Sequence, residues 1–134
     1  MKNILFVVFT FFMGLQVFAQ EVELLDDNEV YSFVSQEAHP KEGIQRFYSN
    51  FSRKINIKEL PNDLMEINVH LEFIVEKDGS FSDIQVINDQ QGFVGQELVR
   101  VLKTMPKWNP GQYDEEMVRS RFTLPIKIRV NVNK

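Results

Sequence analysis

The sequence predicts an α+β domain in which two helices pack on one face of a three-stranded antiparallel sheet. Two apolar stripes with helical spacing and three stretches of alternating apolar residues predict it, and they follow the order helix, strand, strand, helix, strand. The length of 134 residues fits one small domain. The formal net charge of -4 argues against nucleic acid as a partner, because phosphate binding needs Lys and Arg gathered on one face.

Residues 1–19 have the pattern of a secretory signal peptide. Lys2 precedes an apolar run over residues 4–13, and Ala19 supplies a small residue before Gln20. We therefore expect cleavage after Ala19 and a periplasmic protein. The alternative is an uncleaved anchor in the inner membrane, facing the periplasm, but the apolar part is shorter than the roughly 20 residues of a spanning helix. A lipoprotein anchor would need a cysteine, and the chain has none.

Residues 20–39 predict an acidic leader. They carry six acidic residues, two of them adjacent at Asp26 and Asp27, and show little periodicity. Such composition is typical of a solvated segment, here with a short ordered stretch around residues 30–34. The folded domain is then expected over residues 40–134.

The first helix is expected over residues 42–55. Pro40 suits its first turn, and Pro61 marks that it has ended. The apolar residues that define its buried stripe are Ile44, Phe47, Tyr48, Phe51 and Ile55.

An antiparallel hairpin should follow. Residues 67–75 alternate apolar and polar, which indicates a strand with one face on a core. Residues 77–80 form a turn in which Gly79 is free to take a positive φ, and residues 81–88 supply the second strand.

A second helix and a last strand complete the domain. The helix has its apolar positions at Val94, Leu98, Val101, Leu102 and Met105, and Pro106 ends it. The last strand alternates from Val118 to Leu124 and, beyond Pro125, from Ile126 to Val132.

Three runs of this pattern resemble a known family. They are Phe-Ile-Val-Glu-Lys-Asp-Gly-Ser at 73–80, Met-Pro-Lys-Trp-Asn-Pro-Gly at 105–111, and Phe-Thr-Leu-Pro-Ile at 122–126. Together with their spacing they resemble the C-terminal domain of TonB, the energy transducer of outer-membrane transport, over about residues 40–132. The family usually has tyrosine where Leu60 stands and glycine near Glu66. All five prolines lie at or after Pro40, so no proline-rich spacer is expected.

The resemblance implies a stand-alone binding module, not an enzyme, with no cofactor and no metal. Its partner would be a TonB-dependent outer-membrane receptor or another periplasmic or membrane protein. If the first hairpin strand is central, the last strand is an edge with unpaired backbone groups, and an extended peptide can add there. The candidate peptide-binding residues are Ile126, Lys127, Ile128, Arg129, Val130, Asn131 and Val132. Lys127 and Arg129 either attract an acidic ligand or protect the edge from aggregation, and the same edge suits a homodimer.

Two other functions stay open at this stage. One is a complete energy transducer held by an uncleaved N-terminal helix. The other is a small exported hydrolase or metal-binding protein that uses His70 with neighbouring carboxylates, although the pattern favours a solvated strand face with cross-strand ion pairs. Trp108 is expected to fill the core between Pro106 and Pro110 instead of forming an exposed binding site.

Overall fold

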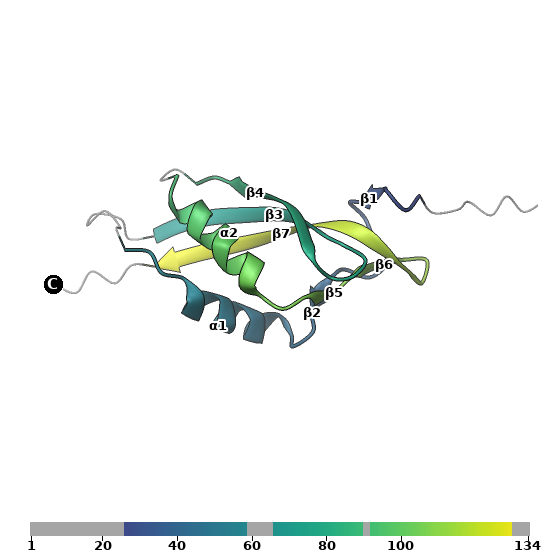
Figure 1. The fold of residues 1–134 in the computed structure, drawn as a ribbon, viewed down its shortest axis with the longest axis horizontal. Coiled ribbons are helices and arrows are strands. Elements are labelled where there is room, and N and C mark those ends of the chain that lie inside the picture. The colour runs from purple at the N-terminus through teal and green to yellow at the C-terminus, as the bar shows by residue number, and fades with distance from the viewer. Residues whose placement is uncertain (1–25, 59–65, 90–91, 130–134) are drawn as a thin grey trace, which may run out of the picture.

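The computed structural model describes residues 26–58, 66–89 and 92–129 (Figure 1). In chain order its elements are β1 (Val30–Tyr31), β2 (His39–Pro40), α1 (Ile44–Lys54), β3 (Glu66–Val75), β4 (Phe81–Ile87), α2 (Val94–Thr104), β5 (Trp108–Asn109), β6 (Gly111–Tyr113) and β7 (Glu116–Arg129). Among these residues no helix combines the length and the apolar character needed to cross a membrane.

The expected three-stranded sheet is wrong. The main sheet has five strands in the order β1-β7-β3-β4, with β6 also paired to β7, and β2 pairs with β5 in a separate two-stranded sheet. The additional strands are two or three residues long, too short to show an alternating pattern in the sequence. One of them, β1, runs parallel to β7, with Val30 opposite Arg119.

The centre of the sheet is the long antiparallel pair of β3 and β7. Ten residues of each strand lie opposite one another without a register shift, from Glu66 opposite Arg129 to Val75 opposite Ser120. The other side of β3 pairs with β4 through the hairpin. A central β3 therefore leaves β4 at one edge and β7 close to the other.

Both helices contribute to one core on the same face of β3. Helix α2 lies over β3 and β4, and α1 lies along the β7 side (Figure 1). Alternate residues of β3 supply the sheet's share, including Leu71 and Phe73, which are fully buried. Trp108 is 1% exposed and fills the centre of this core, as expected from its place between two prolines. Its ring is surrounded at centroid distances of 4.9–5.7 Å by Phe47, Phe73, Phe81 and Phe122.

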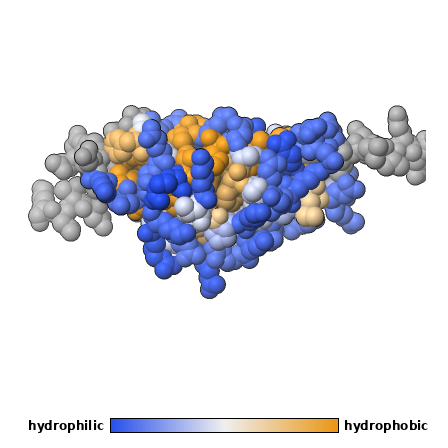
Figure 2. All heavy atoms as spheres, viewed as in Figure 1, coloured by the Kyte–Doolittle hydropathy of each residue, from blue (hydrophilic) through white to orange (hydrophobic). Residues whose placement is uncertain are grey.

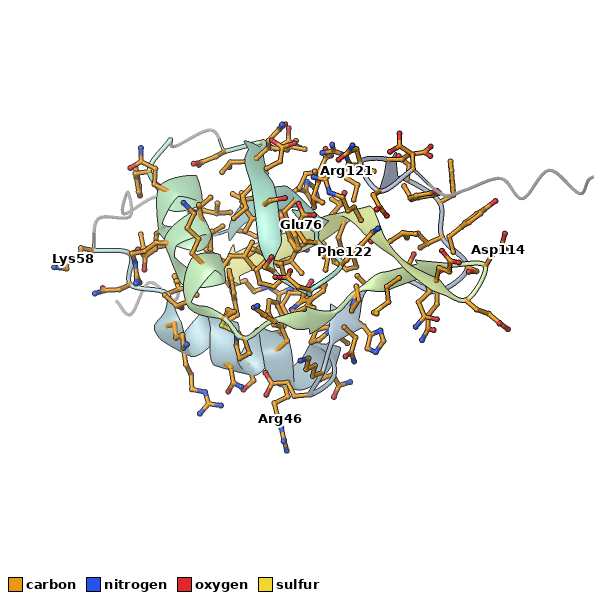
Figure 3. The ribbon with its side chains drawn as sticks, turned by 45° about the vertical axis from the view of Figure 1, so that its right-hand side comes forward. Arg46, Lys58, Glu76, Asp114, Arg121 and Phe122 are labelled. Carbon is orange, nitrogen blue, oxygen red and sulfur yellow. The ribbon has the colours of Figure 1, made fainter. Side chains whose placement is uncertain are left out.

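The β6–β7 hairpin is absent from the sequence expectation. Its two turn residues, Asp114 and Glu115, have φ of 48° and 67°, the positive values that a type I′ turn requires. Asn-Gly and Asp-Gly are the usual signals for this turn, and Asp-Glu is not among them. Asp114 therefore lies at the tip of a hairpin (Figure 3).

Part of the segment expected as an acidic leader packs on the domain. Ala38 is 3% exposed, and the backbone of Gln36 exchanges two hydrogen bonds with Gln112. Residues 39–40 pair with Trp108 and Asn109. This segment is acidic in composition, but parts of its backbone pair with strands that lie about 70 to 90 residues later in the chain.

Candidate functional site at the open edge of β7

Beyond its first residues, β7 has one open edge. On the side away from β3, β1 pairs only with Arg119 and Ser120. Within the described part of the chain, no strand pairs with this side of residues 121–129. The predicted site residues Ile126, Lys127, Ile128 and Arg129 lie on this open edge. The remaining three, Val130, Asn131 and Val132, lie outside the described residues.

Pro125 shows which residues turn their backbone groups to the open edge. The Tyr48 hydroxyl of α1 donates a hydrogen bond of 3.0 Å to the Pro125 carbonyl oxygen, so this carbonyl faces α1. Opposite residues in an antiparallel pair alternate between hydrogen-bonded and non-hydrogen-bonded pairs. Thr123 and Lys127, two residues away on either side, therefore direct their N–H and C=O groups to the open edge, and so does Arg129.

A groove runs between this edge and α1. It has a volume of about 510 Å³. One wall is the face of α1 that carries Tyr48 and Phe51, and the other is formed by the last four described residues of β7. Phe51 is buried at 1% exposure, whereas Ile55 and Ile128 are half-buried and line the groove. Burial raises the pKa of the Tyr48 hydroxyl, as expected for a phenol held between a helix and a strand. An extended chain on the open edge would lie over this groove.

The outer face of the same edge is positively charged. Lys127 and Arg129 each lie 3.5 Å from a carboxylate oxygen of Glu66 on β3. The pKa of Glu66 lies below its usual range, first because the Asn68 amide donates to it and further because of these two cations. Among the described residues, these two cations share one carboxylate, so their charges exceed that of their ion-pair partner by one.

A second hollow lies at the other end of the open edge. Residues 32–38 and β7 residues 120–123 enclose about 350 Å³ there. Phe33, in the wall of this hollow, is 88% exposed. Arg121 is held by Glu72 at 3.0 Å and by Asp83 at 3.7 Å, so its charge is compensated within the protein.

The sheet's other edge, β4, is less suited to pairing. A groove of about 690 Å³ lies between β4 and α2, where hydrophobic side chains reach the surface (Figure 2). The β3–β4 register shifts between Glu72 and Ile74, and Asp83 takes a positive φ of 45° within β4. Such a bulge bends an edge strand and protects it from further pairing.

The polar face around His70 is a set of ion pairs. Arg119 donates to both carboxylate oxygens of Glu76 at 2.7 and 3.0 Å, and Arg121 donates to Glu72. The Arg119 hydrogen bonds are the main reason that the pKa of Glu76 lies below its usual range. Figure 3 shows Glu76 and Arg121 on this side of the sheet. In the described ranges, no three His, Cys, Asp or Glu side chains are placed to hold a metal.

The part that α1 plays in this site was not expected from the sequence. Tyr48 and Phe51 were expected only as contacts with the sheet, whereas they also form a wall of the groove. In the sequence, Pro125 was a signal for the open edge of β7. Proline inside a strand is confined to edges where its missing N–H faces away from the ladder.

Comparisons with protein-family models, with characterised proteins and with solved structures found no match to this chain.

Proposed function

We propose that this protein is a periplasmic, TonB-like binding module that takes up an extended peptide as an additional strand on the open edge of β7. The observation that carries the proposal is the unpaired side of residues 121–129, next to a groove against α1. Main-chain hydrogen bonds to such an edge supply affinity, and the groove supplies selectivity. No catalytic residue is needed.

The proposed partner is a segment near the N-terminus of a TonB-dependent outer-membrane receptor, or a similar segment of another periplasmic or membrane protein. Support for this partner comes from the motif resemblance at 73–80, 105–111 and 122–126. Two of these motifs meet in space, because the Trp108 N–H donates to the Gly79 carbonyl at 3.0 Å. The role would be in TonB-dependent transmembrane transport.

The test is a titration of ¹⁵N-labelled protein, residues 20–134, with peptides from the N-terminal segments of receptors of the same organism. We expect amide shifts to cluster at Lys127 and Arg129, whose N–H groups face the open edge. Peptides that bind without shifting any amide of residues 121–129 would overturn the proposal, as would the absence of binding.

A pair of variants separates backbone pairing from charge. Lys127→Pro removes an N–H on the open side and leaves the ladder to β3 intact, so it should abolish peptide binding without unfolding the protein. Lys127→Ala removes the charge but keeps the N–H, so part of the affinity should remain. Equal binding by the two variants would rule out strand addition at this position.

The proposed location is tested by the N-terminus of the protein recovered from the periplasmic fraction. A chain that begins at Gln20 supports cleavage after Ala19. A membrane-bound chain that still begins at Met1 would favour the anchored energy transducer instead.

A further inference from the structure

We infer that the strand accepted by this edge alternates apolar and acidic residues, and ends its pairing at the Tyr48–Pro125 contact. This inference rests on the proposed function and specifies the ligand of the same site. Three features of the edge support it: the unpaired backbone groups, the groove on one face and the positive charge on the other.

The backbone ladder is interrupted at Pro125. This residue has no N–H, and its carbonyl already accepts the Tyr48 hydroxyl at 3.0 Å. An added strand therefore finds neither a donor nor a free acceptor at this position. Within the described residues, pairing on this side of Pro125 is confined to residues 127–129, unless the Tyr48 hydrogen bond is given up.

On the α1 face, the groove requires apolar side chains. Ligand residues opposite Ile126 and Ile128 lie on the same face of the sheet as these residues, since side chains of opposite residues share a face. That face leads into the groove of about 510 Å³ beside Phe51 and Ile55. Apolar residues at alternate positions of the ligand would be buried there, and charged ones would lose their hydration.

On the other face, the charge favours acidic side chains. Ligand residues opposite Lys127 and Arg129 lie beside these cations, whose side chains are 55% and 75% exposed. Among the described residues, Glu66 is their only ion-pair partner, at 3.5 Å from each. Acidic residues at the intervening positions gain an opposite charge, and basic residues are repelled.

Three synthetic peptides of seven residues, capped at both ends, test the pattern. The first alternates Val with Glu, the second has the same composition with all Val residues before all Glu residues, and the third alternates Val with Lys. We expect the first to bind at least about tenfold more tightly than the other two, from the sum of several cross-strand pairs. Binding is measured by amide shifts and by calorimetry with full-length mature protein.

Variants of the charged face provide the matched control. Glu66→Gln should tighten binding of the Val-Glu peptide, because it removes the carboxylate that competes for the two cations. Lys127→Gln should weaken it, whereas Lys103→Gln, which makes the same charge change on the exposed end of α2, should leave it unchanged. Equal effects of the two lysine variants would show only a long-range charge effect and would overturn the assignment of the acidic face.

Tyr48→Phe tests where pairing ends. The variant frees the Pro125 carbonyl while keeping the ring in the groove. Peptide-induced protection from hydrogen exchange should then reach the Thr123 amide. In the unaltered protein, Lys127 should be the last protected amide on the side of Pro125. Protection that already reaches Thr123 in the unaltered protein would overturn the inferred end point.

The outcomes distinguish this inference from the proposed function. If the alternating and block peptides bind the β7 edge equally, the ligand pattern is wrong and strand addition stands. If no peptide shifts residues 121–129, both fail. If the same shifts arise from protein concentration alone and sedimentation shows a dimer, a second copy occupies the edge and the inferred ligand is wrong.

Discussion

A β-carbon on Gly79 would overlap the carbonyl oxygen of Trp108, whose own N–H donates to the Gly79 carbonyl at 3.0 Å. The turn of the first hairpin is thus in direct backbone contact with the segment that carries the core tryptophan. Gly79 also has a φ of +84°, which side chains rarely allow. The close approach of Trp108 and the positive φ therefore each favour glycine at position 79.

Gly79→Ala should destabilise the protein by well over the roughly 1–3 kcal/mol that a strained φ alone costs. The added methyl group cannot avoid the Trp108 backbone, so the hairpin or the segment after α2 must move. Urea unfolding followed by circular dichroism measures the loss of unfolding free energy.

Gly43→Ala is the matched control for this clash. Gly43 has a φ of +90° but no atom within 4 Å of an added β-carbon. It should therefore show the strain cost alone, about 1–3 kcal/mol. Equal losses in the two variants would show that contact with Trp108 contributes nothing.

Trp108→Ala should cost about 3–5 kcal/mol, the usual range for removing a large buried aromatic side chain. Trp108→Phe should cost clearly less, because the indole N–H finds no hydrogen-bond acceptor among the described residues and its removal breaks no such bond. Phe33→Ala, at a side chain 88% exposed, should change the free energy by less than about 0.5 kcal/mol. Chemical denaturation of the three variants checks this order.

Glu97→Gln should destabilise the protein at pH 7 and lose this effect in acid. The Arg100 side chain, and the Asn56 N–H at 2.8 Å, donate to this carboxylate and lower its pKa from 4.5 to about 2. A depressed pKa gives stability that is present above pH 4.5 and lost as the pH falls toward 2. The difference in unfolding free energy between wild type and variant should therefore shrink over that window. Glu116→Gln, at an exposed carboxylate, should give no comparable change.

Tyr48→Phe should lower stability by about 1 kcal/mol, the net contribution of a typical hydrogen bond. The variant leaves the Pro125 carbonyl without its partner at 3.0 Å and otherwise keeps the ring. Tyr113→Phe makes the same chemical change at a tyrosine that is 38% exposed and should be close to neutral. Thermal unfolding of both variants gives the comparison, and a neutral Tyr48→Phe would mean that water replaces the hydroxyl.

Long periodic elements could be predicted from the sequence, and the candidate site only in part. Helix α1 lies within the expected range of 42–55, and β3 begins one residue before its expected start. Lys127 and Arg129 lie on an open edge of β7, which was expected from placing the first hairpin strand at the centre of the sheet. The groove beside them was not predicted, because it depends on where α1 crosses the end of β7.

The sequence by itself determined the elements whose residues bury a repeated face, because such periodicity is a property of neighbouring residues. It also determined the central aromatic residue, Trp108, which two prolines bracket. Only the tertiary structure decided the number of strands and the extent of the open edge. Val30 and Tyr31 form a strand only because Arg119 and Ser120 lie opposite them, some 89 residues later. Pairing of backbone groups that far apart leaves no trace in a local pattern, since every residue carries the same N–H and C=O.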